Sequence, residues 1–194
     1  MEIPESLLQQ AMQTSRVPMR SVSSEQIASL LERHGWLRSV AGDEDFDKAV
    51  KAIVSMFATG RGLFLTGPAG CGKTQLIKAV KGMLNISGAH LFYCKEKDDI
   101  DYIRYNTDEE LPYSVIVDDI GAEEIIREYG NVIDVVGDFI QRYHYRGQGR
   151  FLSTSNLNSQ QINERYGGRI LDRILEMCVV IKFTGKSKRQ RIIF

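Results

Sequence analysis

Gly67-Pro-Ala-Gly-Cys-Gly-Lys73-Thr74, or GPAGCGKT, is the stretch of sequence that decides the fold. It matches GxxxxGK[ST], the pattern of a phosphate-binding loop. The apolar run GLFLT at 62–66 precedes it and reads as a strand, and a helix is expected over 73–84. Glycines let the backbone curl so that its N–H groups point inward at phosphate oxygens, and the helix N-terminus adds partial positive charge. The sequence therefore predicts a strand–loop–helix unit that binds a nucleotide.

Each residue of this loop is a candidate ligand of the phosphates: Gly67, Pro68, Ala69, Gly70, Cys71, Gly72, Lys73 and Thr74. Lys73 would reach the β- and γ-phosphates, and the Thr74 hydroxyl would bind Mg²⁺. The expected cofactors are therefore ATP and Mg²⁺. A glycine-rich turn with only a structural role is the alternative, and the full eight-residue match between a strand and a helix argues against it.

The run Val115-Ile-Val-Asp118-Asp119 supplies carboxylates at the end of an apolar strand. Asp118 would hold Mg²⁺, largely through water, because this ion keeps several of its waters. Asp119 is placed to act as a general base that orients the attacking water. A buried run followed by Asp in a turn is common in α/β proteins, but its position after a phosphate loop favours a role in catalysis.

A second polar strand end is Phe151-Leu-Ser-Thr-Ser-Asn156. A polar side chain at the end of this strand would lie between the two acids and the γ-phosphate. Asn156 is therefore the candidate to position the attacking water. The alternative is an ordinary strand-to-turn transition in which Asn156 caps the turn.

Two arginines, Arg169 and Arg173, lie four residues apart on one side of an expected helix. The planar guanidinium suits a γ-phosphate, and an arginine finger from a neighbouring subunit can raise the hydrolysis rate by orders of magnitude. Pairing of Arg173 with Asp172 or Glu176 on a solvated helix is the alternative.

Short apolar runs alternate with helical segments after Gly60, which predicts an α/β fold with a parallel five-stranded sheet. The expected strands are 62–66, 90–94, 114–118, 150–155 and 179–183, with a short edge strand over 189–194. The expected helices are 73–84, 98–105, 124–144 and 159–176. Residues 1–58 read as an N-terminal helical extension and 59–194 as the ATPase core. In the extension we expect a first helix at 4–12. A second helix should begin after Ser23, which has capping-box spacing with Gln26, and a third should cover 45–58. Trp36 should pack between the second and third helices.

The bulk composition is that of a soluble globular protein: 194 residues, 43% hydrophobic, 26% charged and a net charge of zero. No run approaches the roughly 18 apolar residues needed to span a bilayer, and the polar start is unlike a secretory signal peptide. Three widely spaced cysteines give no disulfide or zinc pattern, so a cytoplasmic location is expected. Residues 92–124 are acidic and 141–194 are basic. The basic stretch 182–191 either contacts nucleic-acid phosphates or decorates a surface strand.

Taken together, GPAGCGKT, VIVDDIGAE, FLSTSNL and YGGRILDRI resemble the DnaC/IstB group of AAA+ ATPases, which comprises replicative helicase loaders and transposition helper proteins. The resemblance covers about residues 60–194. It implies a P-loop NTPase fold with an AAA+ core, Lys73 and Thr74 at Walker A, Asp118 and Asp119 at Walker B, Asn156 as sensor 1, and Arg173 as the finger with Arg169 nearby. It also implies that the chain has no C-terminal lid domain.

The leading functional hypothesis is a helicase-loader-like ATPase that self-associates with ATP and acts on a replicative helicase and single-stranded DNA. A transposition helper that acts with a transposase has the same chemistry. A small-molecule kinase would need an arginine-rich lid, which the sequence does not display. A nucleotide-binding scaffold that does not hydrolyse ATP is a further alternative, because Asp119 is one methylene shorter than the usual glutamate.

Overall fold

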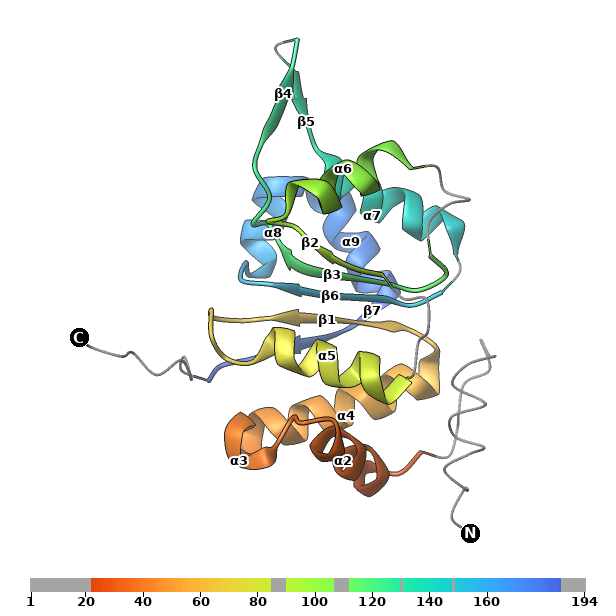
Figure 1. The fold of residues 1–194 in the computed structure, drawn as a ribbon, viewed down its shortest axis with the longest axis vertical. Helices are drawn as coiled ribbons and strands as arrows, with labels where there is room; N and C mark the ends of the chain where they lie inside the picture. The colour runs from red at the N-terminus through yellow and green to blue at the C-terminus, as the bar shows by residue number, and fades with distance from the viewer. Residues whose placement is uncertain (1–21, 85–89, 107–111, 130, 148, 186–194) are drawn as a thin grey trace, which may run out of the picture.

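The computed structural model describes residues 22–84, 90–106, 112–129, 131–147 and 149–185. Five parallel strands form one sheet in the order β2-β3-β6-β1-β7, and helices cover both of its faces (Figure 1). The strands of this sheet are β1 Gly62–Thr66, β2 His90–Tyr93, β3 Val115–Ile120, β6 Phe151–Ser155 and β7 Cys178–Lys182. The helices are α2 Ser24–Arg33, α3 Arg38–Ala41, α4 Asp43–Thr59, α5 Lys73–Leu84, α6 Lys97–Tyr105, α7 Val135–Arg146, α8 Ser159–Tyr166 and α9 Gly168–Met177.

The central strands are apolar on both faces because helices bury both sides of a parallel sheet. In β1, Leu63 and Leu65 join the core formed with α2, α4 and α5, whereas Phe64 joins the core formed with α6, α7 and α9. This alternation follows from the two-residue period of a strand. The expected strands are confirmed to within about two residues at each end, and β3 continues two residues further than predicted, to Ile120.

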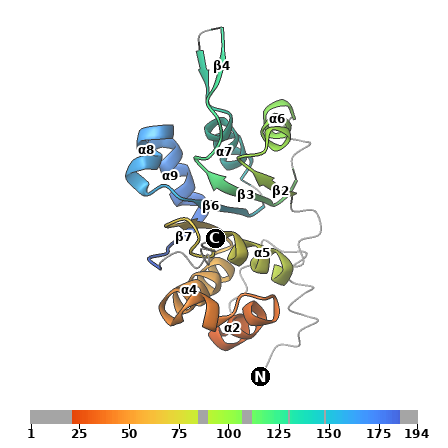
Figure 2. The same cartoon turned by 60° about the vertical axis from the view of Figure 1, so that its left-hand side comes forward.

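The helices before β1 pack against the same side of the sheet as α5 (Figure 2). The capping box is confirmed: the Ser23 hydroxyl accepts from the Gln26 N–H at 3.2 Å, and the Gln26 side chain accepts from the Ser23 N–H at 3.0 Å. Trp36 is only 3% exposed. Its ring stacks on Phe46 at 5.4 Å and meets Phe183 edge-on at 6.3 Å. The expected packing role of Trp36 is therefore confirmed.

A continuous helix over 124–144 is wrong. The segment instead forms an antiparallel hairpin, β4 Ile126–Glu128 with β5 Asn131–Ile133, and only then α7. Helix α7 begins where the Asp134 carboxylate accepts a hydrogen bond from the Gly137 N–H at 2.8 Å. The β-branched residues of the hairpin favour strands over helix.

A single helix over 159–176 is also wrong, because Gly167 separates α8 from α9. Its φ of 83° lies in the left-handed region, which a glycine adopts without steric cost. The expected helix at 4–12 and the edge strand at 189–194 lie outside the described residues.

Cys71, Cys94 and Cys178 are buried, and none of them forms a disulfide in the structure. Among the helices that the structure describes, none is long and apolar enough to cross a membrane.

Candidate functional site

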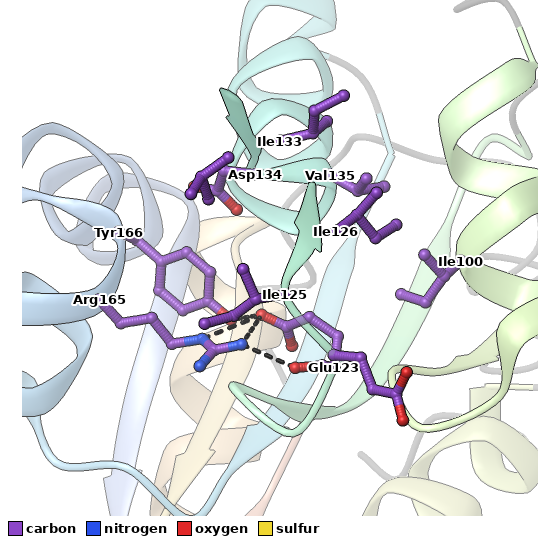
Figure 3. Close-up of a pocket in the computed structure, with 11 residues that line it drawn as sticks. Ile100, Glu123, Ile125, Ile126, Ile133, Asp134, Val135, Arg165 and Tyr166 are labelled. Carbon is purple, nitrogen blue, oxygen red and sulfur yellow. Dashed lines mark hydrogen bonds and ion pairs between the residues drawn. The ribbon is translucent and has the colours of Figure 1, made fainter. Parts of the chain in front are cut away.

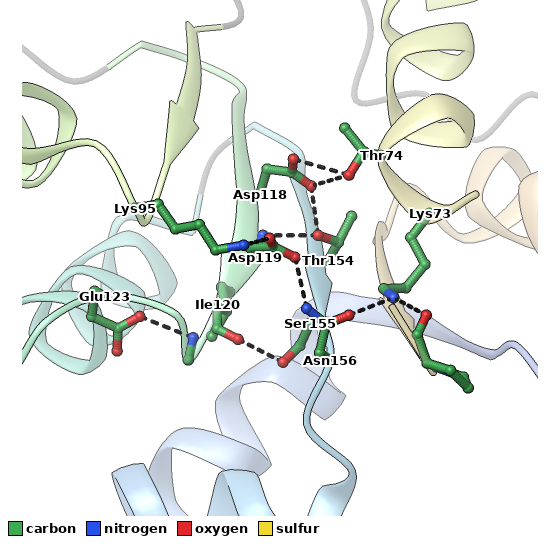
Figure 4. A network of polar contacts seen from close by, with 12 residues as sticks. Lys73, Thr74, Lys95, Asp118, Asp119, Ile120, Glu123, Thr154, Ser155 and Asn156 are labelled. Carbon is green, nitrogen blue, oxygen red and sulfur yellow. Dashed lines mark hydrogen bonds and ion pairs between the residues drawn. The ribbon is translucent and has the colours of Figure 1, made fainter. Parts of the chain in front are cut away.

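The candidate site lies at the carboxyl ends of β1, β3 and β6, where the sheet brings the phosphate loop beside both polar strand ends (Figure 4). A pocket of ≈ 290 Å³ opens there. The loop can take its shape only with glycine at its first position: a Cβ on Gly67, whose φ is 146°, would lie 2.6 Å from the Phe183 carbonyl oxygen. The pocket is lined by Trp36, Ala41, Ala69, Gly70, Cys71, Gly72, Lys73, Thr74, Gln75, Lys95, Asp119 and Asn156.

Lys73 is the cation at the base of the phosphate loop in this pocket, and only 5% of it is exposed. Its ammonium donates to the carbonyl oxygens of Gly67 and Pro68 and to the Asn156 side-chain oxygen, each at 2.8 Å. These acceptors fill the hydrogen-bonding capacity of the ammonium, but because they are uncharged they leave its positive charge uncompensated. An entering phosphate would therefore meet a fixed positive charge at the base of the loop.

Thr74, in the first turn of α5, faces Asp118 of β3. The Thr74 hydroxyl lies 3.1 and 3.0 Å from the two Asp118 carboxylate oxygens, and the Thr154 hydroxyl donates to Asp118 at 2.6 Å. A hydroxyl beside a carboxylate is the kind of oxygen donor set that suits Mg²⁺. Among the described residues no three His, Cys, Asp or Glu side chains form a metal cluster. Mg²⁺ held here would share its coordination with substrate phosphates and water.

Asp119 adopts φ = 62°, in the left-handed region that few residues other than glycine occupy. At this point the β3–β6 register shifts between Val117 and Ile120. The Asp119 N–H donates to the Thr154 hydroxyl at 2.8 Å, which fixes the turned backbone. The carboxylate thereby points to the pocket, where Lys95 donates to it at 2.6 Å.

Asn156 connects the loop lysine to the second acid. Its side-chain oxygen accepts from Lys73 at 2.8 Å, and its amide nitrogen donates to Asp119 at 3.2 Å (Figure 4). The structure thus brings together the residues that the sequence predicted for the loop, both acids and Asn156. Sequence reasoning missed Lys95 and Thr154. Thr154 lies within the quoted strand, but Lys95 carries no motif that would single it out.

A second polar cluster holds the chain just after Asp119 (Figure 3). The Glu123 carboxylate accepts from the Gly121 N–H at 2.9 Å, from Arg165 at 2.9 and 3.1 Å, and from the Tyr166 hydroxyl. Burial raises the pKa of Tyr166 well above its usual range, and the negative charge of Glu123 raises it further. The Tyr166 hydroxyl therefore remains protonated and donates its hydrogen bond. The cluster joins the segment after β3 to α8, which follows β6.

Arg169 and Arg173 lie in a different place from the pocket. Arg173 donates to Glu176 at 3.0 Å and lies 5.8 Å from the Tyr145 ring centroid, and Arg169 donates to the Tyr145 hydroxyl. Glu176 also pairs with His144 at 2.6 Å. These hydrogen bonds, first to His144 and then to Arg173, lower the pKa of Glu176. Within the described part of the protomer, neither arginine lines the phosphate-loop pocket.

The strand order and the loop define the class of the chain, an α/β P-loop NTPase fold in which β6 separates the loop strand β1 from the acidic strand β3. No protein-family model and no curated protein matches it.

Three solved structures with a similar fold are a candidate primosome component from Streptococcus pyogenes serotype M3, DnaI and the DnaC helicase loader. Their identities are 20%, 22% and 19%, with TM-scores of 0.49, 0.47 and 0.45. The alignments cover 77%, 96% and 64% of this chain and 82%, 94% and 78% of the respective structures. Because each TM-score is below 0.5, the class of the chain rests on its own strand order and loop.

Proposed function

We propose that this chain is an ATPase that converts ATP and water to ADP and phosphate, and that it acts in DNA replication in the manner of a helicase loader. The observation that carries the proposal is the chain of contacts from Lys73 through Asn156 to Asp119. Lys73, the proposed phosphate-binding cation, and Asp119, the proposed base, contact opposite ends of the Asn156 side-chain amide in one pocket.

In this proposal the loop N–H groups and Lys73 bind the phosphates, and Asp119 and Asn156 orient a water for in-line attack on the γ-phosphorus. Thr74 and Asp118 would hold Mg²⁺, which supplies charge neutralisation at the β- and γ-phosphates. Lys73 faces the charge that develops on the γ-phosphoryl oxygens. Trp36 and Ala41 also line the pocket, where they would contact the adenine ring of ATP.

Arg173 pairs with Glu176 within its own protomer, and neither Arg173 nor Arg169 lines the described pocket, so their proposed role belongs to self-association. In an ATP-dependent homo-oligomer, Arg173 would act on the nucleotide of a neighbouring protomer, with Arg169 beside it. In the proposal, the protein partner is a replicative helicase and the nucleic acid that the assembly contacts is single-stranded DNA. A transposase is the alternative partner, and measuring the binding of this chain to a purified helicase and to a purified transposase would discriminate between the two.

The test measures ATP turnover per protomer over a range of protein concentrations, with and without single-stranded DNA. Lys73→Ala and Arg173→Ala are assayed alone and then mixed in equal amounts. A site completed by the neighbour predicts a rate that rises with concentration, two inactive variants, and recovery of activity in the mixture. Lys51→Ala, on the exposed side of α4, is the matched control and should behave as the wild type.

Two results would contradict the proposal. Turnover that survives Lys73→Ala removes the hydrolytic role of this pocket. Full activity of Arg173→Ala, or a mixture that stays inactive, removes the shared site but leaves hydrolysis within one protomer.

A scaffold that binds ATP without hydrolysing it is the second candidate, and the ion pair between Lys95 and Asp119 favours it. The Lys95 ammonium occupies one Asp119 carboxylate oxygen at 2.6 Å, so that oxygen is not free to accept a hydrogen bond from an attacking water. Saturable ATP binding with no phosphate release at any protein concentration would select this function.

A further inference from the structure

The backbone that carries Asp119 departs from regular strand geometry, and the register of β3 against β6 shifts between Val117 and Ile120. Asp119 has φ = 62° and Gly121 has φ = 95°, both in the left-handed region. The Ala122 N–H donates to the Asp119 carbonyl oxygen at 2.9 Å and closes a turn. A left-handed conformation is costly for a residue other than glycine and persists where the surrounding structure holds it. The position of the Asp119 carboxylate therefore depends on the contacts that hold this turn.

The end of β6 holds the start of the turn. The Thr154 hydroxyl accepts from the Asp119 N–H at 2.8 Å. The Ser155 hydroxyl donates to the Ile120 carbonyl oxygen at 2.6 Å. Because Thr154 and Ser155 are both buried, these contacts tie the turn firmly to the strand that leads to Asn156.

Glu123 holds the other end of the turn. One of its carboxylate oxygens accepts from the Gly121 N–H at 2.9 Å. The other accepts from the Arg165 guanidinium at 2.9 and 3.1 Å and from the Tyr166 hydroxyl (Figure 3). Arg165 also donates to the Glu123 carbonyl oxygen at 2.8 Å. Only 8% of the Glu123 side chain is exposed and both of its oxygens accept hydrogen bonds, so it is placed to act through the turn rather than on a ligand.

The cluster connects the turn to helix α8. Arg165 and Tyr166 lie in the last turn of α8, which follows Asn156 in the chain. Asn156 and Asp119 are themselves hydrogen-bonded at 3.2 Å in the pocket. A buried ion pair gives little net stability compared with apolar packing, and in several proteins it specifies one conformation instead. Here the conformation that it would specify is the path of the chain after Asp119.

We propose that Glu123, Arg165 and Tyr166 are positioning residues for Asp119, because they hold the turn that directs its carboxylate at the attacking water. The inference rests on the proposed function, since the position of a base affects the rate only if the chain hydrolyses ATP. The alternative is a cluster that only packs α8 against the sheet. Such a cluster would contribute to stability without a selective effect on turnover.

The experiment uses the full chain and measures kcat and KM for ATP at protein concentrations that saturate the rate, together with urea unfolding. Arg165→Gln removes both guanidinium hydrogen bonds to the Glu123 carboxylate. Tyr166→Phe removes one hydroxyl and keeps the ring in the core. Arg142→Gln is the matched control, because Arg142 of α7 donates to the Ile103 carbonyl oxygen of α6 at 2.6 Å and so also joins two elements.

We expect Arg165→Gln to lower kcat at least about tenfold and Tyr166→Phe about threefold or more, because a small displacement of a reacting group has a large effect on rate. The KM for ATP should stay within about twofold of the wild type in both variants, as for an interaction made only in the transition state. Arg142→Gln should lower the urea midpoint comparably and keep kcat within about twofold of the wild type.

Each contrary outcome has a separate meaning. Equal kcat values for Arg165→Gln and Arg142→Gln would overturn the positioning role and leave the proposed ATPase intact. A change confined to the protein concentration at half-maximal rate would assign Arg165 to a contact between protomers and would also overturn the positioning role. Absence of turnover by the wild type at every protein concentration would overturn the proposed function, and the positioning role with it.

Discussion

The Lys95 ammonium and the Asp119 carboxylate form an ion pair of 2.6 Å at the wall of the phosphate-loop pocket. The same carboxylate accepts a hydrogen bond from Asn156 at 3.2 Å. Asp119 is therefore restrained on both of its oxygens by side chains from the ends of the neighbouring strands. Lys95 follows the edge strand β2, so a displacement of β2 would lengthen or break the ion pair with the Asp119 carboxylate.

Lys95→Met should raise ATP turnover in the absence of partners by about three- to tenfold, because the Lys95 ammonium would no longer compete with the attacking water for the Asp119 carboxylate. The KM for ATP should be unchanged. Lys97→Met, on the first turn of α6, is the matched control. A fall in kcat with a rise in KM would instead identify Lys95 as a ligand of the phosphates.

Trp36 is the only tryptophan of the chain, and it lines the nucleotide pocket. A Cβ placed on Gly72 would lie 3.7 Å from its indole nitrogen. Addition of ATP or ADP should therefore change the tryptophan emission, and removal of the nucleotide should restore it. In Lys73→Ala the titration should shift to at least about tenfold higher nucleotide concentration. An emission that does not respond to nucleotide in the wild type would place the ligand away from Trp36.

Glu123→Gln should lower turnover while leaving nucleotide affinity unchanged, because Glu123 touches the segment after Asp119 and not the pocket. The glutamine keeps the size of the side chain but weakens the contacts to Arg165 and Tyr166. We expect a loss of about 1–3 kcal/mol in the free energy of unfolding, measured with urea. Glu124→Gln, at the exposed neighbouring position, should leave both quantities unchanged. Equal turnover by the two variants would show that the cluster has only a structural role.

Asp134 gives a prediction that depends on pH. Partial burial raises the pKa of its carboxyl above the ordinary value, although the hydrogen bond from Gly137 opposes this shift. Folding therefore disfavours the ionised form. The associated stability is greatest when the group is protonated and is lost as pH rises through the folded-state pKa.

Asp134→Asn retains the cap of α7 and removes this charge, so it should be at least as stable as the wild type at neutral pH. The difference should disappear at acidic pH. Asp134→Ala should lose about 0.5–2 kcal/mol through the missing cap. Urea unfolding at both pH values measures these effects. An Asn variant less stable than the wild type at neutral pH would contradict the assignment.

The sequence predicted the sheet well because its strands are short apolar runs bounded by polar or glycine residues. It failed at 124–144, where apolar residues recur at a spacing that also suits a helix. The β-branched pairs Ile125–Ile126 and Val132–Ile133, on either side of Tyr129-Gly130, were a hairpin signal of comparable strength. Gly167-Gly168 was likewise a visible sign that one helix would become two.

The positions of the loop residues, Asp118, Asp119 and Asn156 follow from topology, because parallel strands place their carboxyl ends at one edge of the sheet. The sequence could not predict the contact between Lys95 and Asp119. That contact depends on the left-handed backbone at Asp119 and on the pairing of β2 with β3. Both are tertiary features without a local signature.

Trp36 also gives the helices before β1 a thermodynamic connection to the ligand. Its ring lies between Phe46 of α4 and Phe183 after β7, while one edge reaches the loop at Gly72. A nucleotide that contacts this ring would stabilise the packing of α2 to α4. If a molecule bound to those helices changes nucleotide affinity, nucleotide changes the affinity for that molecule by the same factor.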